Sequence, residues 1–121
     1  MSVTSTARSA PNAIARKLDV IQSKGALKSV DIANVLGTRP ETVSRWNQGR
    51  AFPQRDKEKL ILELEYVVDR LSDLYEPDDA RLWLFSRQKL LGGKTPAELI
   101  QKGHTEEVLQ VIGQQSEGVY L

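Results

Sequence analysis

Six polar side chains between residues 39 and 50 could form hydrogen bonds with a nucleic acid. They are Arg39, Thr42, Ser44, Arg45, Gln48 and Arg50. Arginine can donate two parallel hydrogen bonds to guanine, whereas serine, threonine and glutamine can bond to bases or phosphates. If Val43 and Trp46 form the inner face of a helix, the six side chains lie on its outer face and at its ends. Arg50 and Arg55 flank that helix and suit phosphate contacts. The set therefore predicts a helix that reads DNA.

The formal net charge of +1 conceals a difference between the two halves of the chain. Residues 1–55 contain nine lysines and arginines against three acidic residues, a charge of +6. Residues 56–121 contain eight against thirteen, a charge of −5. A basic half suits a polyanion such as DNA, whereas an acidic half is repelled by DNA and could serve a different partner. The alternative is a chance distribution of charge over solvated faces.

Catalytic and metal-binding chemistry has few candidate residues. The chain has no cysteine, which excludes disulfides and thiolate metal sites, and His104 is its single histidine. The acidic pairs at 78–79 and 106–107 lie in the first turns of predicted helices, where carboxylates favour the positive end of the helix dipole. The segment Gly-Gly-Lys-Thr at 92–95 lacks the earlier glycine of a phosphate-binding loop. We therefore expect no enzyme, no metal and no cofactor.

The chain is expected to be cytoplasmic and not to bind a membrane. No apolar run approaches the roughly 18 residues that a membrane helix needs. The first residues also lack the apolar centre of a signal peptide.

Apolar residues recur at helical spacing along most of the chain, and no alternation with a period of two extends over five residues. Residues 1–11, rich in serine, threonine and alanine, predict a mobile arm. Helices are then predicted at 12–25, 29–36, 38–49, 55–75, 77–85, 95–103 and from 105 onward. The predicted fold class is all-α.

Capping boxes are predicted at two helix starts, Thr38 with Glu41 and Thr95 with Glu98, each with a proline in the first turn. We interpret Glu41 as a capping residue in preference to a base-reading one. In the long helix at 55–75, leucines and valines recur at steps of four and three residues. This stripe indicates a core face, with a dimer seam as the alternative.

The basic half also has the residue order of a helix-turn-helix. Ala33 allows the next helix to approach closely, and Gly37 supplies a tight turn. Val43 and Trp46 then lock that helix at a steep crossing angle. Over residues 12–56 the chain resembles the Xre/lambda-repressor-like group, which implies that the helix after the turn enters the major groove of DNA. The alternative is a three-helix core without DNA affinity.

The acidic half contains three short motifs in a specific order. They are Trp-Leu-Phe-Ser at 83–86, Gly-Gly at 92–93 and Pro-Ala-Glu-Leu at 96–99. Together with the helix-turn-helix before them, they resemble the Xre/MbcA/ParS family of type II antitoxins over nearly all of residues 12–121. The resemblance implies a RES-domain toxin that destroys NAD as the partner. It also implies binding to operator DNA for autoregulation.

By this resemblance, the second lobe and the C-terminal tail cover the mouth of the toxin's active site. The implied toxin contacts are Trp83, Phe85, Gly118, Val119, Tyr120 and Leu121. For Trp83 and Phe85 the alternative is a place in the core, which is the better expectation for at least one of them. For residues 118–121 the alternative is a frayed chain end.

These inferences divide the chain into five parts. They are an arm at 1–11, a DNA-binding lobe at 12–54, a long bridging helix at 55–76, a toxin-binding lobe at 77–117 and a tail at 118–121. Because one helix-turn-helix makes few phosphate contacts, we expect a homodimer or a higher hetero-oligomer with the toxin. One alternative function is a stand-alone regulator whose second lobe dimerises or senses a ligand. A small hydrolase is another, and the absence of catalytic groups argues against it.

Overall fold

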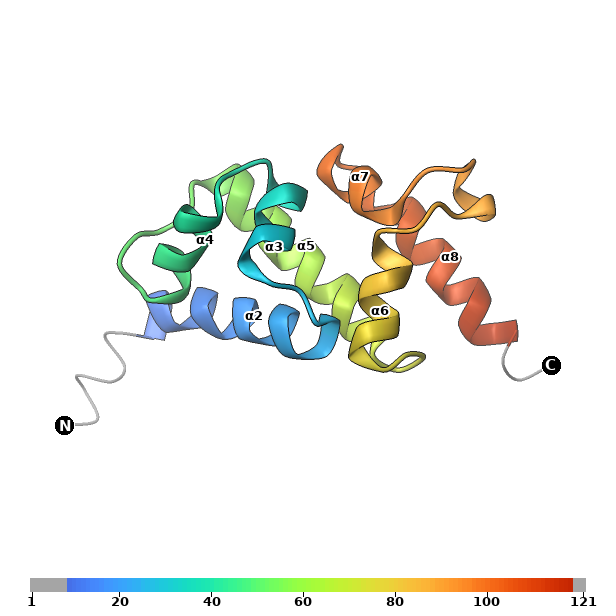
Figure 1. Ribbon diagram of the computed structural model, residues 1–121, viewed down its shortest axis with the longest axis horizontal. Helices are drawn as coiled ribbons and strands as arrows, with labels where there is room; N and C mark the ends of the chain where they lie inside the picture. The colour runs from blue at the N-terminus through green and yellow to red at the C-terminus, as the bar shows by residue number, and fades with distance from the viewer. Residues whose placement is uncertain (1–8, 119–121) are drawn as a thin grey trace.

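The computed structural model describes residues 9–118, and within them the chain is almost entirely helical (Figure 1). The elements are α2 (Ser9–Gly25), α3 (Ser29–Leu36), α4 (Pro40–Asn47), α5 (Arg55–Leu71), α6 (Pro77–Leu84), the 3-10 helix η1 (Lys89–Leu91), α7 (Pro96–Gln101) and α8 (Thr105–Gly118). Over this range no strand forms, and Gln88 and Lys94 make an isolated antiparallel bridge. The predicted all-α fold class is confirmed.

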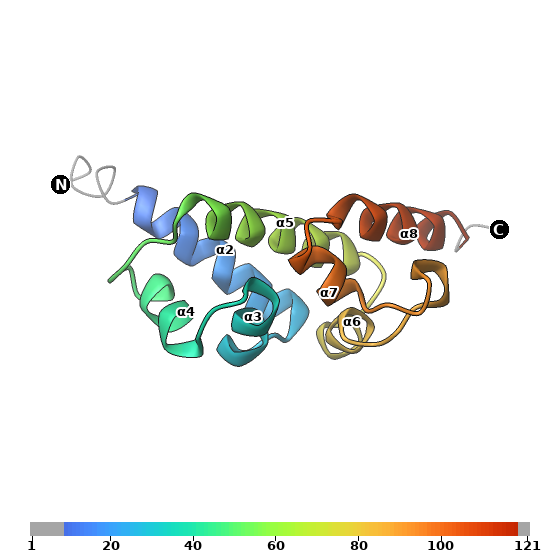
Figure 2. The same cartoon turned by 90° about the horizontal axis from the view of Figure 1, so that it is seen from above.

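Helix α5 links two groups of helices. Helices α2, α3 and α4 lie at one end of the molecule, and α6, α7 and α8 lie at the other end (Figure 1). Seen from above, α5 and α8 lie along one side, and α3, α4 and α6 lie along the other (Figure 2). One cluster of buried apolar residues draws on both groups, so the two groups share a core.

The inner face of α5 is buried in that core. Five of its residues are buried, Ile61, Leu64, Val67, Val68 and Leu71, and Leu60 and Leu74 pack partly buried against them. This confirms the interpretation of the apolar stripe as core, because its side chains are used within the chain and are unavailable as a dimer seam. Helix α2 packs lengthwise against α5 with its own buried residues, Ile14, Leu18 and Ile21.

The start of α4 differs from the prediction. Arg39 is the N-cap residue and Pro40 occupies the first helical turn, with no side-chain capping hydrogen bond. The predicted capping box of Thr38 and Glu41 is therefore wrong, and Glu41 is an exposed residue of the first turn. The physical reason is the proline, whose fixed φ suits the first helical position, so the cap falls on the residue directly before it.

The second predicted capping box is confirmed. The Glu98 amide donates to Thr95 Oγ1 at 3.1 Å, and the Thr95 amide donates to Glu98 Oε1 at 2.8 Å. The turn that precedes this capping box was not predicted from the sequence. Between α6 and α7, Gly92 and Gly93 both adopt positive φ, which lets the chain turn back and pair Lys94 with Gln88.

Three predicted boundaries also shift. Helix α2 already begins at Ser9, so residues 9–11 are helical and not part of an arm; Pro11 is tolerated there because the amides of a first turn have no partner within the helix. Helix α5 ends at Leu71, with a hydrogen-bonded turn after it, and α8 extends to Gly118. The rest of the predicted arm, residues 1–8, and the tail residues Val119, Tyr120 and Leu121 lie outside the described residues.

Within residues 9–118, none of the helices is both long enough and apolar enough to cross a membrane.

Candidate nucleic-acid and partner-binding surfaces

The side chains predicted to read DNA lie on and around α4. Four of them, Arg39, Arg45, Gln48 and Arg50, are exposed, while Thr42 and Ser44 are half-buried. The opposite face of α4 holds Val43 and Trp46, which are buried as predicted. Helix α4 therefore presents a polar face to solvent and an apolar face to α2 and α3, which both contact it.

Two contacts fix α4 and the turn that precedes it. The Asn47 side chain donates from Nδ2 to the Ala15 carbonyl at 3.3 Å and to Asp19 Oδ1 at 3.1 Å, which ties the end of α4 to α2. At the turn, Gly37 has a φ of +71°, a conformation that favours glycine, and Lys57 Nζ donates to the Leu36 carbonyl at 2.7 Å. Helix α5 thus holds the turn in place with a charge-assisted hydrogen bond.

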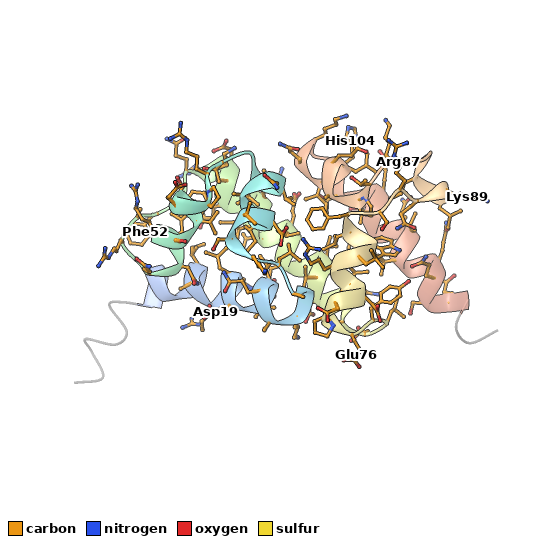
Figure 3. The ribbon with its side chains drawn as sticks, in the orientation of Figure 1. Asp19, Phe52, Glu76, Arg87, Lys89 and His104 are labelled. Atoms are coloured by element: carbon orange, nitrogen blue, oxygen red, sulfur yellow. The ribbon has the colours of Figure 1, made fainter. Side chains whose placement is uncertain are left out.

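An aromatic residue on this side of the molecule was missed by the sequence reasoning. Phe52 follows α4 in the loop that leads to α5, and 60% of its surface is exposed. It projects outward at the outer edge of the α4 region (Figure 3). Both Arg50 and Arg55 are exposed and flank it along the chain. The sequence did contain a signal for Phe52. It is an aromatic residue between two arginines, and it directly follows the helix predicted to read DNA.

In the second group of helices, the two aromatic residues that the family resemblance implied as toxin contacts differ in burial. Trp83 is buried, with 7% of its surface exposed, and its indole nitrogen has no hydrogen-bond partner. Phe85 is half-buried, and the guanidinium of Arg81 lies 5.5 Å from the centre of its ring. The alternative of a core position is therefore confirmed for Trp83.

The exposed apolar side chains of this region are two leucines. Leu82 on α6 and Leu90 in η1 are 65% and 63% exposed. Leu82 lines an open groove of about 310 Å³. The other lining residues are Tyr75, Asp79, Trp83, Ser86 and Gln88. We call this the α6 groove. The sequence reasoning missed both leucines, because the neighbours of Trp83 on the helix are both leucines, and only one of them, Leu82, is exposed while Leu84 is buried.

An ion pair joins the two groups of helices. Arg81 on α6 donates to both carboxylate oxygens of Asp31 on α3, at 2.9 and 3.2 Å, and the Lys28 amide donates to the same carboxylate at 2.9 Å. Burial alone would raise the pKa of Asp31, but the hydrogen bonds from Arg81 and from the Lys28 amide outweigh it and hold that pKa below its ordinary value. Asp31 is thus ionised and fixed between the two groups.

The side chains considered above for catalysis or metal binding do not come together in one site. His104 is exposed and directly precedes α8, and its Nδ1 lies 3.1 Å from Glu107 Oε2 in the first turn of that helix. Asp78 and Asp79 are exposed in the first turn of α6. Among the residues that the structure describes, no group of three or more potential ligands could hold a metal ion.

The chain resembles antitoxins in both sequence and structure. No protein-family model matches it. MbcA, the mycobacterial cidal antitoxin of Mycobacterium tuberculosis, is 34% identical to it over 91 residues, which are 75% of this chain and 80% of MbcA. The chain belongs to the MbcA family of antitoxins. The family resemblance inferred from the sequence motifs is confirmed.

Other relatives agree with this assignment. MbcA of Mycobacterium bovis shows the same identity and coverage. A second Mycobacterium tuberculosis protein, named a probable mycobacterial cidal antitoxin, is 29% identical over 92 residues, 76% of this chain and 78% of its own. A chain in the crystal structure of the Mycobacterium tuberculosis MbcT–MbcA toxin–antitoxin complex matches with a TM-score of 0.80 and 31% identity, over 90% of this chain and 97% of that chain. The MbcA-like fold therefore covers nearly all the described residues.

Proposed function

We propose that this MbcA-family antitoxin neutralises a partner toxin by binding to it directly. The observation that carries the proposal is the match to a chain of the MbcT–MbcA complex, together with the identity to MbcA. We infer that the partner is a RES-domain toxin that consumes NAD. This finer assignment is supported by the motifs at 83–86, 92–93 and 96–99, in which the resemblance to the family of RES–Xre antitoxins lies.

The toxin-binding surface that we propose is the α6 groove together with Leu90, which follows the lining residue Gln88 by two positions. Exposed leucines beside an open groove are typical of a protein–protein contact, because association removes their apolar surface from water. Trp83 supports the wall of this groove from inside the core, and Leu82 is the side chain that reaches outward. We therefore assign the direct contacts to the leucines and a positioning role to the tryptophan.

We retain residues 118–121 as a proposed second contact. The apolar residues Val119 and Leu121, together with the aromatic ring of Tyr120, suit a cavity shaped for a nucleotide. Gly118, the first residue of this segment, is the last residue of α8. Together, the groove and the tail would cover the mouth of the toxin's active site and exclude NAD.

An NAD-consumption assay tests this proposal. The purified toxin is assayed alone, with the full-length chain, and with a chain that lacks residues 118–121. We expect the full-length chain to stop NAD consumption and the shortened chain to inhibit less well, while both bind DNA equally. A toxin that consumes NAD at an undiminished rate beside a stoichiometric amount of folded antitoxin would contradict the proposal.

We further propose that the antitoxin binds its own operator through α4 and so represses its own synthesis. Support comes from the +6 charge of residues 1–55, from the exposed arginines on and beside α4, and from Gly37 at the turn that precedes this helix. Phe52 would add an apolar contact, against deoxyribose or a thymine methyl group, between the phosphate contacts of Arg50 and Arg55.

Binding to the DNA upstream of the antitoxin's own gene, measured by fluorescence anisotropy at several salt concentrations, tests this second proposal. We expect affinity to fall steeply with salt, because phosphate contacts release counterions. Scrambled DNA of equal length is the control. Equal affinity for the two DNA molecules at every salt concentration would contradict operator recognition.

A further inference from the structure

An open cleft of about 530 Å³ lies where the first group of helices meets the second. Its walls come from the end of α3 and the turn that follows it, from the first turns of α5 and from the end of α7. Helix α7 contacts both α3 and α5. The polar lining comprises Gly37, Asp56, Lys57, Lys59, Gln101 and Lys102. We call this the lysine cleft.

The lysine cleft carries an excess of positive charge. Its lining contributes three ammonium groups, those of Lys57, Lys59 and Lys102, against the single carboxylate of Asp56. Lys59 and Lys102 are exposed to solvent, and Lys57 is half-buried. Within the part of the chain that the structure describes, none of the three lysines forms an ion pair. Cations gathered in a concave surface attract anions from solution.

The cleft also has hydrogen-bond donors directed at one point beside Gly37. A side-chain carbon added at this glycine would lie 3.3 Å from the amide nitrogen of Gln101 and 3.6 Å from Lys57 Nζ. Two donors thus approach the same space, one from α7 and one from α5. Lys57 uses one of its three N–H groups for the Leu36 carbonyl, which leaves two for a ligand. An anion rich in oxygen, such as a phosphate group, matches these donors.

The backbone of Lys102 has a fixed place at the edge of the cleft. Lys102 is the C-cap of α7, and just after it the His104 amide donates back to the Leu99 carbonyl at 2.8 Å. The next residue, Thr105, donates from Oγ1 to Glu63 Oε1 on α5 at 2.6 Å. This turn is therefore tied to both α7 and α5. The second group of helices presents a lysine to the first group through it.

The cleft adjoins the surface for which we propose DNA binding. Gly37 lies two residues before Arg39, the N-cap of α4, and Lys57 lies two residues after Arg55. When a helix-turn-helix binds DNA, the start of its second helix contacts base edges, and its first helix crosses the phosphate backbone. The turn between α3 and α4 would then lie close to the DNA, with the cleft open beside it.

We propose that the lysine cleft binds the phosphate backbone of the operator next to the bases that α4 reads. This inference rests on the operator binding proposed above, and it adds a DNA contact from the second group of helices, which is acidic overall. Lys59 and Lys102 contact the phosphates from the two sides of the cleft. Because phosphate contacts carry no sequence information, the cleft contributes affinity and orientation, whereas α4 contributes specificity.

The salt dependence of DNA binding tests the cleft. Fluorescence anisotropy on the full chain, with labelled operator DNA and scrambled DNA at several salt concentrations, compares the original chain with Lys59→Ala/Lys102→Ala. Lys57 is left in place because it holds the turn before α4. The loss of two phosphate contacts should reduce the slope of log affinity against log salt by about 1.8, or about 0.9 per contact. Affinity at low salt should fall for both DNA molecules alike.

A matched control separates the cleft from the total charge of the protein. Lys89→Ala/Lys94→Ala removes the same charge from two exposed lysines between α6 and α7 that do not line the cleft. This variant should retain the slope and the affinity of the original chain. Inhibition of the toxin by Lys59→Ala/Lys102→Ala should be unchanged, which shows that the variant is folded.

The outcomes distinguish this inference from the function on which it rests. An original chain that binds no DNA overturns both. An original chain that binds its operator, with an unchanged salt slope in Lys59→Ala/Lys102→Ala, overturns the cleft alone. Equal losses of slope in the two double variants also overturn it, because total charge would then account for the effect. So would a loss of affinity for the operator without any loss for scrambled DNA.

Discussion

The two candidate binding surfaces of this antitoxin are built in the same way and differ in the polarity of what they expose. Each has a buried tryptophan, Trp46 in α4 and Trp83 in α6, with 5% and 7% of their surfaces exposed. The exposed neighbour of Trp46 is Arg45, whereas the exposed neighbour of Trp83 is Leu82. In both places the aromatic residue fixes the helix and the residue beside it faces the solvent. In the functions proposed above, the arginine would face a polyanion and the leucine an apolar protein surface.

The largest effect should come from removing the tryptophan that supports the α6 groove. Trp83→Ala leaves a cavity in the core and should lower the free energy of unfolding by about 3–5 kcal/mol. Urea denaturation measures this, with Leu82→Ala as the matched control, because truncation of an exposed leucine should change stability by no more than about 0.5 kcal/mol. A Trp83→Ala chain of unchanged stability that no longer binds toxin would show that the tryptophan is a direct contact.

The next largest effect should be on operator binding, without a change in toxin inhibition. Arg39→Ala with Arg45→Ala removes two arginines from the reading face, and each bidentate contact with a base contributes about 1–3 kcal/mol. We expect operator affinity to fall roughly 30-fold or more, measured by fluorescence anisotropy. Inhibition of the toxin should not change. A double variant that binds its operator normally would show that another helix reads the DNA.

A smaller effect, on toxin binding, is expected from truncating the two exposed leucines. Leu82→Ala with Leu90→Ala should weaken the toxin complex roughly tenfold, because two apolar side chains no longer contact the partner. Isothermal titration calorimetry measures the change, and Val30→Ala serves as the control for an exposed apolar residue elsewhere. If the two leucine substitutions leave toxin affinity intact, the α6 groove is not the binding surface.

The ion pair that joins the two groups should give the smallest effect, and one that depends on pH. Because the pKa of Asp31 is lowered in the folded chain, its contribution to stability is complete above the unfolded value near 3.8 and is lost as the pH falls through the folded value. Asp31→Asn should lower the free energy of unfolding by about 1 kcal/mol at neutral pH, because its partner Arg81 is largely exposed to solvent. Thermal unfolding should show this difference narrowing below about pH 4. A difference that stays constant on acidification would contradict an ionised Asp31.

The first half of the chain was well predicted because its pattern depends on local sterics. A small residue at 33, a glycine at 37 and inward residues at 43 and 46 specify how two successive helices pack, and all of these requirements lie within fourteen residues. The start of α4 was predicted two residues too early. Both Thr38 and Pro40 are typical of a helix start, and in the structure the helix begins at Pro40.

The second half was harder because its surface depends on contacts between distant residues. The motif at 83–86 correctly indicated the family, yet it did not indicate which side chain is buried. That depends on the packing of α6 against the rest of the core, which a single sequence does not display. Likewise, the pairing of Asp31 with Arg81 spans 50 residues and has no local signature.

The most direct test of the account compares two double variants in two assays. Arg39→Ala/Arg45→Ala and Leu82→Ala/Leu90→Ala are each measured for operator binding and for inhibition of NAD consumption by the toxin. We expect the arginine variant to lose operator binding and still inhibit the toxin, and the leucine variant to bind the operator and inhibit the toxin less well. If both variants lose both activities while remaining folded, the separation of the two surfaces is contradicted.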